Sequence, residues 1–60
     1  MDAESLKENI GKLCKVVLKN NYSYTITIPK FEGTTISAVD KFGNVIRIDI
    51  SSIATLIELG

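Results

Sequence analysis

The stretch that decides the fold is Val45-Ile46-Arg47-Ile48-Asp49-Ile50-Ser51-Ser52-Ile53-Ala54-Thr55-Leu56-Ile57-Glu58-Leu59. Its first half alternates isoleucine with polar residues, and this period of two predicts a strand with one buried face. After Ser51-Ser52 the pattern changes, because Ala54 and Leu56 make the second face apolar as well. A strand that is apolar on both faces needs two apolar neighbours, and a second copy of the chain can be one of them.

The length of the chain also points to self-association. Sixty residues, 1–60, form a single domain, and a domain of this size buries only about 60% of the surface that it exposes when unfolded. One cysteine and no histidine leave no intrachain disulfide and predict no metal site. Oligomerisation is the remaining common support for so small a core.

Charge and composition narrow the classes of function. Seven basic and seven acidic residues cancel, so no strong overall field draws the chain to nucleic acid or to a membrane. The absence of a long apolar run and of a signal sequence, together with a single thiol, predicts a cytoplasmic protein with no membrane contact. Without histidine or an informative nucleophile–base spacing, we expect neither enzymatic activity nor a cofactor.

The periodicity along the chain predicts one helix followed by short strands. Asp2 is a suitable N-cap and Gly11 a suitable stop for a helix over residues 2–10. Asn20-Asn21 and Gly43 or Asn44 provide positive backbone φ angles for tight turns. The expected fold is mainly β, a short N-terminal α-helix followed by a five-stranded antiparallel SH3-like small barrel, with strands at about 12–19, 22–29, 34–40, 45–51 and 53–59.

Several segments resemble motifs of the Sm/LSm family of RNA-binding proteins. Ile10-Gly11-Lys12 resembles the family's junction after the helix, and residues 18–24 (LKNNYSY) resemble its L-K-N-G-x-x-Y hairpin. Residues 35–40 resemble the pattern N-L-x-L-x-D, and residues 45–47 match V-I-R. The chain departs from the family where glycine is usual, with Asn21, Ile26 and Ile48, and where the family has the base-reading asparagine, with Thr35 or Ile36.

This resemblance implies an Sm-like barrel whose fourth and fifth strands pair between subunits, so that identical copies close a ring around single-stranded RNA. The implied RNA contacts come from the loop after the second strand and from the loop between the last two strands: Lys30, Phe31, Glu32, Thr34, Thr35, Arg47, Asp49, Ser51 and Ser52. Arginine, threonine and serine supply the donors and acceptors that base edges and phosphates require. The expected subunit interface is Ile48, Ile50, Ile53, Ala54 and Leu56.

Other interpretations of single residues stay open at this stage. Arg47 can instead form a surface ion pair with Asp49, which would contribute little stability. Tyr22 and Tyr24 can stack on bases, but their alternation with isoleucines favours a place in or near the core. Cys14 alternates with buried-type residues, which favours a small buried hydrophobe over a reactive thiol.

Two further functions compete with the RNA-binding ring. The first is a structural or protein-interaction module of Sm-like or SH3-like fold that binds no nucleic acid, which the neutral net charge favours. The second is a small-ligand regulatory barrel within a larger enzyme complex, which would be a monomer or a dimer.

Overall fold

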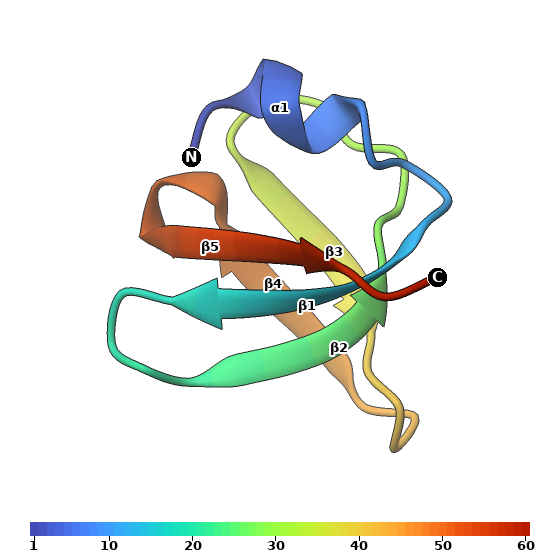
Figure 1. The fold of residues 1–60 in the computed structure, drawn as a ribbon. Helices are drawn as coiled ribbons and strands as arrows, with labels where there is room; N and C mark the ends of the chain where they lie inside the picture. The colour runs from blue at the N-terminus through green and yellow to red at the C-terminus, as the bar shows by residue number, and fades with distance from the viewer.

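The computed structural model describes all 60 residues and shows a mainly β protein with one short helix (Figure 1). All paired strands are antiparallel. This confirms the expected class, a mainly β protein with a short N-terminal helix followed by five antiparallel strands. The elements are α1 Ala3–Lys7, β1 Leu13–Leu18, β2 Ser23–Thr27, β3 Thr35–Val39, β4 Val45–Asp49, the 3-10 turn η1 Ile50–Ser52, and β5 Ile53–Glu58.

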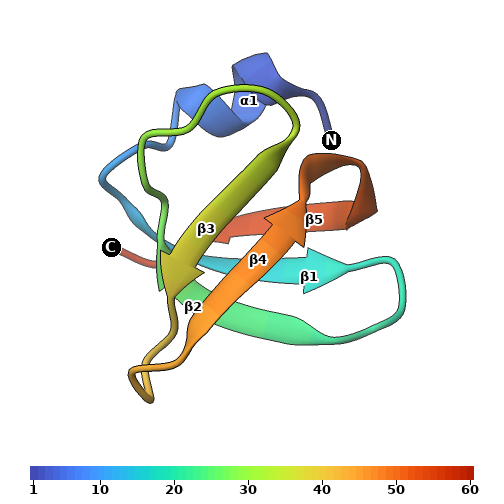
Figure 2. The same cartoon turned by 180° about the vertical axis from the view of Figure 1, so that it is seen from behind.

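The five strands form two sheets, one with the order β2-β1-β5 and one made by the β3–β4 hairpin. The hairpin crosses obliquely over the three-stranded sheet, as the front and back views show (Figure 2). A single bridge between Ile26 and Asp40 joins β2 to the end of β3, and the Ile50 N–H donates to Thr34 O at 2.8 Å. The strand ladders therefore make two sheets and do not run on continuously into a closed barrel.

The core lies between the inner faces of the two sheets, and α1 covers one end of it (Figure 1). Alternation along each strand sends every second side chain inward. The buried side chains are all apolar: Leu6, Cys14, Val16, Ile26, Ile28, Ile36, Ala38, Ile48, Ile50 and Ile53. The burial of Cys14 confirms its interpretation as a small hydrophobe.

This core corrects part of the expected subunit interface. Ile48, Ile50 and Ile53 are at most 5% exposed and pack inside their own chain, so their side chains are not available to a second copy. The reason is that η1 turns the chain between β4 and β5, and both strands then direct isoleucines into the same core. Tyr22 also departs from the expected core position, because it precedes β2 and is 66% exposed.

The helix is shorter than the expected span 2–10. The Asp2 carboxylate caps it by accepting a hydrogen bond from Ser5 N–H at 2.8 Å, and Leu6 anchors it in the core. Beyond Lys7 the backbone continues as turns, and Gly11, with φ +87°, donates its N–H to Ile28 O at 2.8 Å. So short a helix depends on such packing, since isolated helices of this length do not persist in water.

Both hairpin turns form where the sequence predicts them. Asn21 has φ +72° between β1 and β2, and Gly43 has φ +85° between β3 and β4. In the second turn the Asp40 carboxylate accepts hydrogen bonds from the backbone N–H groups of Phe42 and Asn44, each at 2.9 Å. These bonds fix the turn because they substitute for ladder bonds that the chain gives up on reversing direction.

The bend expected at Ser51-Ser52 is the 3-10 turn η1. The Asp49 carboxylate caps it by accepting from the Ser51 N–H at 3.1 Å and from the Ser51 hydroxyl at 3.0 Å. The Lys19 N–H then donates to Ser52 O at 2.9 Å, which guides the chain onto β1. As a result β4 pairs with β3, β5 pairs with β1, and each keeps one edge without a strand partner.

Candidate functional site

The outer face of the β3–β4 hairpin gathers polar side chains from both strands. Thr35 lies directly across from Asp49, and Ser37 lies directly across from Arg47, and all four are exposed. Side chains in such cross-strand positions are close enough to act on one ligand. Ser37 also belongs to this surface, and it was missed by the sequence analysis because only the strand register places it beside Arg47.

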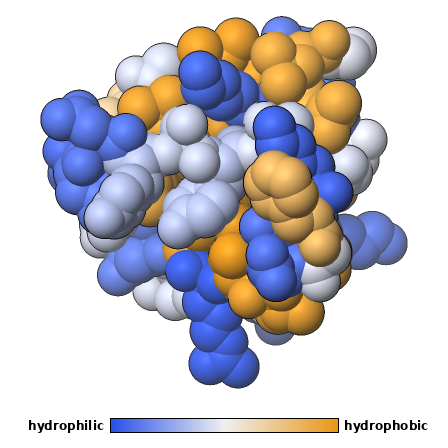
Figure 3. All heavy atoms as spheres, turned by 90° about the horizontal axis from the view of Figure 1, so that it is seen from below, coloured by the Kyte–Doolittle hydropathy of each residue, from blue (hydrophilic) through white to orange (hydrophobic).

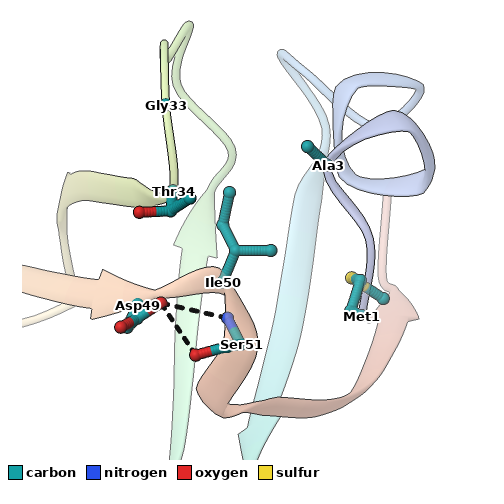
Figure 4. A pocket seen from close by; sticks show the side chains of 7 residues that line it. All are labelled: Met1, Ala3, Gly33, Thr34, Asp49, Ile50 and Ser51. Carbon is teal, nitrogen blue, oxygen red and sulfur yellow. Dashed lines mark hydrogen bonds between the residues drawn. The ribbon is translucent and has the colours of Figure 1, made fainter.

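A hollow of about 360 Å³ lies where β4 ends, beside the N-terminus of the chain (Figure 4). It brings Thr34 together with Asp49 and Ser51, three of the expected site residues, and its other lining residues are Met1, Ala3, Gly33 and Ile50. The carboxylate of Asp49 is held against Ser51 by the two capping bonds drawn in Figure 4. Asp49 and Ser51 thus have a structural role in η1, which local spacing alone did not distinguish from a ligand contact.

Arg47 lies in a separate groove of about 380 Å³ between the end of β1 and β4. Lys19 and Asn20 line this groove together with Arg47 and Ser52, and the remaining lining residues are Leu18, Ile48 and Asp49. The groove exists because η1 leads β5 back along β1. It therefore sets two cations, Lys19 and Arg47, beside hydroxyl and amide groups, a combination suited to a phosphate and the edge of a base.

The ion pair considered for Arg47 is absent. The one ion pair in the structure joins Lys12 Nζ to Glu58 Oε1 at 3.6 Å, between half-exposed side chains. Arg47 therefore has no carboxylate partner within its own chain, and its guanidinium is free to contact a ligand.

The first part of the expected RNA-contacting loop lies elsewhere. Lys30, Phe31 and Glu32 border a shallow hollow of about 510 Å³ together with Ile10, beyond α1. Phe31 is half-buried against the core, which limits its area for base stacking. Eight of the nine expected site residues thus line three surfaces, the groove and the two hollows, and Asp49 lines two of them. Thr35 lies outside all three, on the outer face of the hairpin.

The accessible part of the expected subunit interface is on β5. Ala54 is exposed, and Leu56 is half-buried opposite Val16. On the outer face of the same sheet, Ile57 and Leu59 are 44% and 51% exposed. β5 therefore presents apolar side chains beside an edge that lacks a strand partner within the chain.

Two other findings bear on the class of protein. No group of three or more acidic or cysteine side chains lies close enough together to hold a metal ion. None of the helices has the length and hydrophobicity needed to cross a membrane.

Comparison of the chain with protein-family models, with curated proteins and with solved structures finds no match in any of the three.

Proposed function

We propose that this chain is an Sm-like protein with an SH3-like small barrel, which assembles into a homo-oligomeric ring and binds single-stranded RNA as a scaffold or chaperone. The observation that carries the proposal is that β4 and β5, consecutive in the chain, each leave one edge unpaired. Unpaired edges are templates for strand addition. Pairing β4 of one copy with β5 of the next is a head-to-tail contact, which closes a ring when the rotation between copies allows it.

Assembly also resolves the conflict between RNA binding and zero net charge. A single copy has only a small groove in which two cations, Lys19 and Arg47, outnumber one carboxylate, Asp49. A ring repeats that groove in every copy, so that positive groups gather along one path although each chain remains neutral overall. A path of this kind matches the repeating phosphates of a single strand.

Solution mass tests assembly. Light scattering after size-exclusion chromatography is expected to give a multiple of the 6.6 kDa chain mass at micromolar concentration. Ala54→Lys places a charge beside the β5 edge and is expected to lower that mass without unfolding the chain. Thr27→Lys, at an exposed position on β2, is the matched control. A monomer at all concentrations would refute the ring.

Fluorescence anisotropy with uridine-rich and adenine-rich oligonucleotides tests RNA binding. Affinity is expected to fall as salt rises, and Arg47→Ala is expected to weaken binding and to reduce the salt dependence by about one counterion per altered contact. Lys7→Ala removes an exposed cation of α1 that lines none of the three surfaces, and it is expected to have little effect. An affinity that changes neither with salt concentration nor on the Arg47→Ala substitution would contradict this part of the proposal.

One observation favours a second candidate, a protein-interaction module that binds no nucleic acid. Val39 and Val45 form an exposed cross-strand pair, 56% and 71% exposed, on the β3–β4 hairpin. Exposed apolar side chains beside an open strand edge are typical of protein contacts. In that case oligonucleotides do not bind, and Arg47→Ala changes neither assembly nor partner binding.

A further inference from the structure

A further hollow, of about 280 Å³, lies between β2 and the turn that joins β3 to β4. Its lining comes from three parts of the chain: Lys15 of β1, Ser23, Tyr24 and Thr25 of β2, and Asp40, Lys41 and Phe42 of the turn. The bridge between Ile26 and Asp40 holds the turn against β2. None of these residues lines the groove of Arg47 or the hollow beside the N-terminus.

The turn carries a solvent-exposed aromatic ring on a backbone held by hydrogen bonds. Phe42 is 77% exposed, the most exposed of the large apolar side chains. Its backbone N–H is bonded to the Asp40 carboxylate, and the same carboxylate accepts from Asn44. Because Asp40 is also bridged to β2, the backbone that carries the ring is held against the sheet, and the exposed ring is available for stacking on a flat ligand.

Two lysines line the hollow together with this ring. Lys41 Nζ lies 5.3 Å from the centroid of the Phe42 ring, and Lys15 stands on the neighbouring strand directly across from Thr25. Neither lysine has a carboxylate partner in the structure. Asp40 is the one acidic residue of the lining, and its carboxylate oxygens are occupied by the hydrogen bonds of the turn.

Hydroxyl groups complete the hollow. Ser23 is exposed and Thr25 is half-buried on the outer face of β2, and both provide donors and acceptors next to Lys15. The face of the molecule seen from below, toward which this turn projects, shows hydrophobic and hydrophilic side chains lying next to one another (Figure 3). A flat ring that carries an anionic group would therefore find a partner for each part in this hollow.

We propose that this hollow binds one nucleotide unit, with its base stacked on Phe42 and its phosphate held by Lys15, Lys41 and the hydroxyls of β2. A volume of about 280 Å³ suits a single nucleotide better than a larger ligand. The site is distinct from the Arg47 groove and requires neither a ring nor RNA binding at that groove. The nucleotide is either free or part of a single strand, since both have the same base and phosphate.

Amide chemical shifts of the full chain, titrated with adenosine 5′-monophosphate, adenosine, inorganic phosphate and a short adenine oligonucleotide, test the proposal. The monophosphate is expected to shift the amides of Thr25, Lys41 and Phe42 and to bind at least about fivefold more tightly than adenosine or phosphate alone. Phe42→Ala is expected to weaken its binding about tenfold, the size of a lost stacking contact. Lys15→Ala is expected to weaken it and to reduce its salt dependence.

The controls separate this site from nonspecific adhesion and from the RNA groove. Tyr22→Ala removes another exposed aromatic ring, 66% exposed, that does not line the hollow and is expected to leave the affinity unchanged. Arg47→Ala is likewise expected to have no effect on the monophosphate. If the oligonucleotide shifts these amides and the monophosphate does not, and Phe42→Ala weakens the binding of the oligonucleotide, the ligand is a nucleotide within a single strand. No shift with either ligand, or equal effects of Phe42→Ala and Tyr22→Ala, overturns the proposal.

Discussion

Truncation of Ile53 to alanine tests how the last strand contributes to the fold. Ile53 begins β5 and is fully buried in the core. The substitution removes three carbon atoms, which at about 0.8 kcal/mol each gives about 2.4 kcal/mol of lost transfer free energy. The cavity that remains adds to this, so a loss of about 3 kcal/mol in the free energy of unfolding is expected, within the usual range of about 2–5 kcal/mol.

This loss is large for a chain of this length. At about 0.05–0.15 kcal/mol per residue, a 60-residue domain has a total stability of about 3–9 kcal/mol. Urea unfolding followed by circular dichroism measures the change. With a slope of about 1 kcal/mol per molar urea for a small chain, the midpoint is expected to fall by about 3 M, or the variant is unfolded without denaturant.

Ile57→Ala is the matched control, because the same residue type in the same strand is 44% exposed. It is expected to cost about 1 kcal/mol, since less apolar surface returns to water and no closed cavity forms. Any part of its effect that depends on protein concentration reports assembly through β5, because association stabilises by mass action. Equal losses for the two variants at low concentration would refute the assignment of Ile53 to the core and Ile57 to the surface.

Three further outcomes are expected. Asp49→Ala removes the acceptor of both Ser51 hydrogen bonds and should lower the free energy of unfolding by about 1 kcal/mol, measured in thermal melts. Asp49→Asn keeps an acceptor and should cost less. Equal losses for the two variants would contradict the capping role of Asp49. The Asn44 backbone N–H, followed by that of Phe42, holds the pKa of Asp40 below its ordinary value of 3.8; the stability linked to this carboxylate is therefore present above pH 3.8 and is lost as the pH falls below it. Thermal melts at a series of pH values measure this loss, and Asp40→Asn should reduce the dependence of stability on pH below 3.8. An unchanged pH dependence in the variant would exclude Asp40 as its source. Burial raises the pKa of the Cys14 thiol, with Glu58 adding to the effect, so a thiol reagent should react slowly with the folded chain and rapidly in urea, and immediate reaction in native buffer would contradict the core position of Cys14.

The local features of this chain are predictable because they depend on residues close together in the sequence. Alternation with a period of two identifies all five strands to within a few residues. The positive φ angles at Asn21 and Gly43 follow from side chains that tolerate or permit that conformation. The cap at Asp2 and the burial of Cys14 are likewise consequences of local spacing.

The functional surfaces depend on pairings between distant residues, which periodicity does not contain. Strand register places Ser37 beside Arg47 on the outer face of the hairpin. The return of β5 along β1 brings Lys19 into the groove that Arg47 lines. The bridge from Ile26 to Asp40 carries Phe42 to the edge of β2.

The stretch from Val45 to Leu59 shows the division between sequence and tertiary structure most clearly. Its alternation determines by itself that two apolar strands form and that the chain breaks near Ser51-Ser52. Alternation does not say which apolar face meets which neighbour. That choice is made by η1, which turns Ile50 and Ile53 into one core and leaves Ile57 on the outer surface. The physical reason is that a period of two defines faces, whereas only the packing of one sheet against another decides which face is shielded from water.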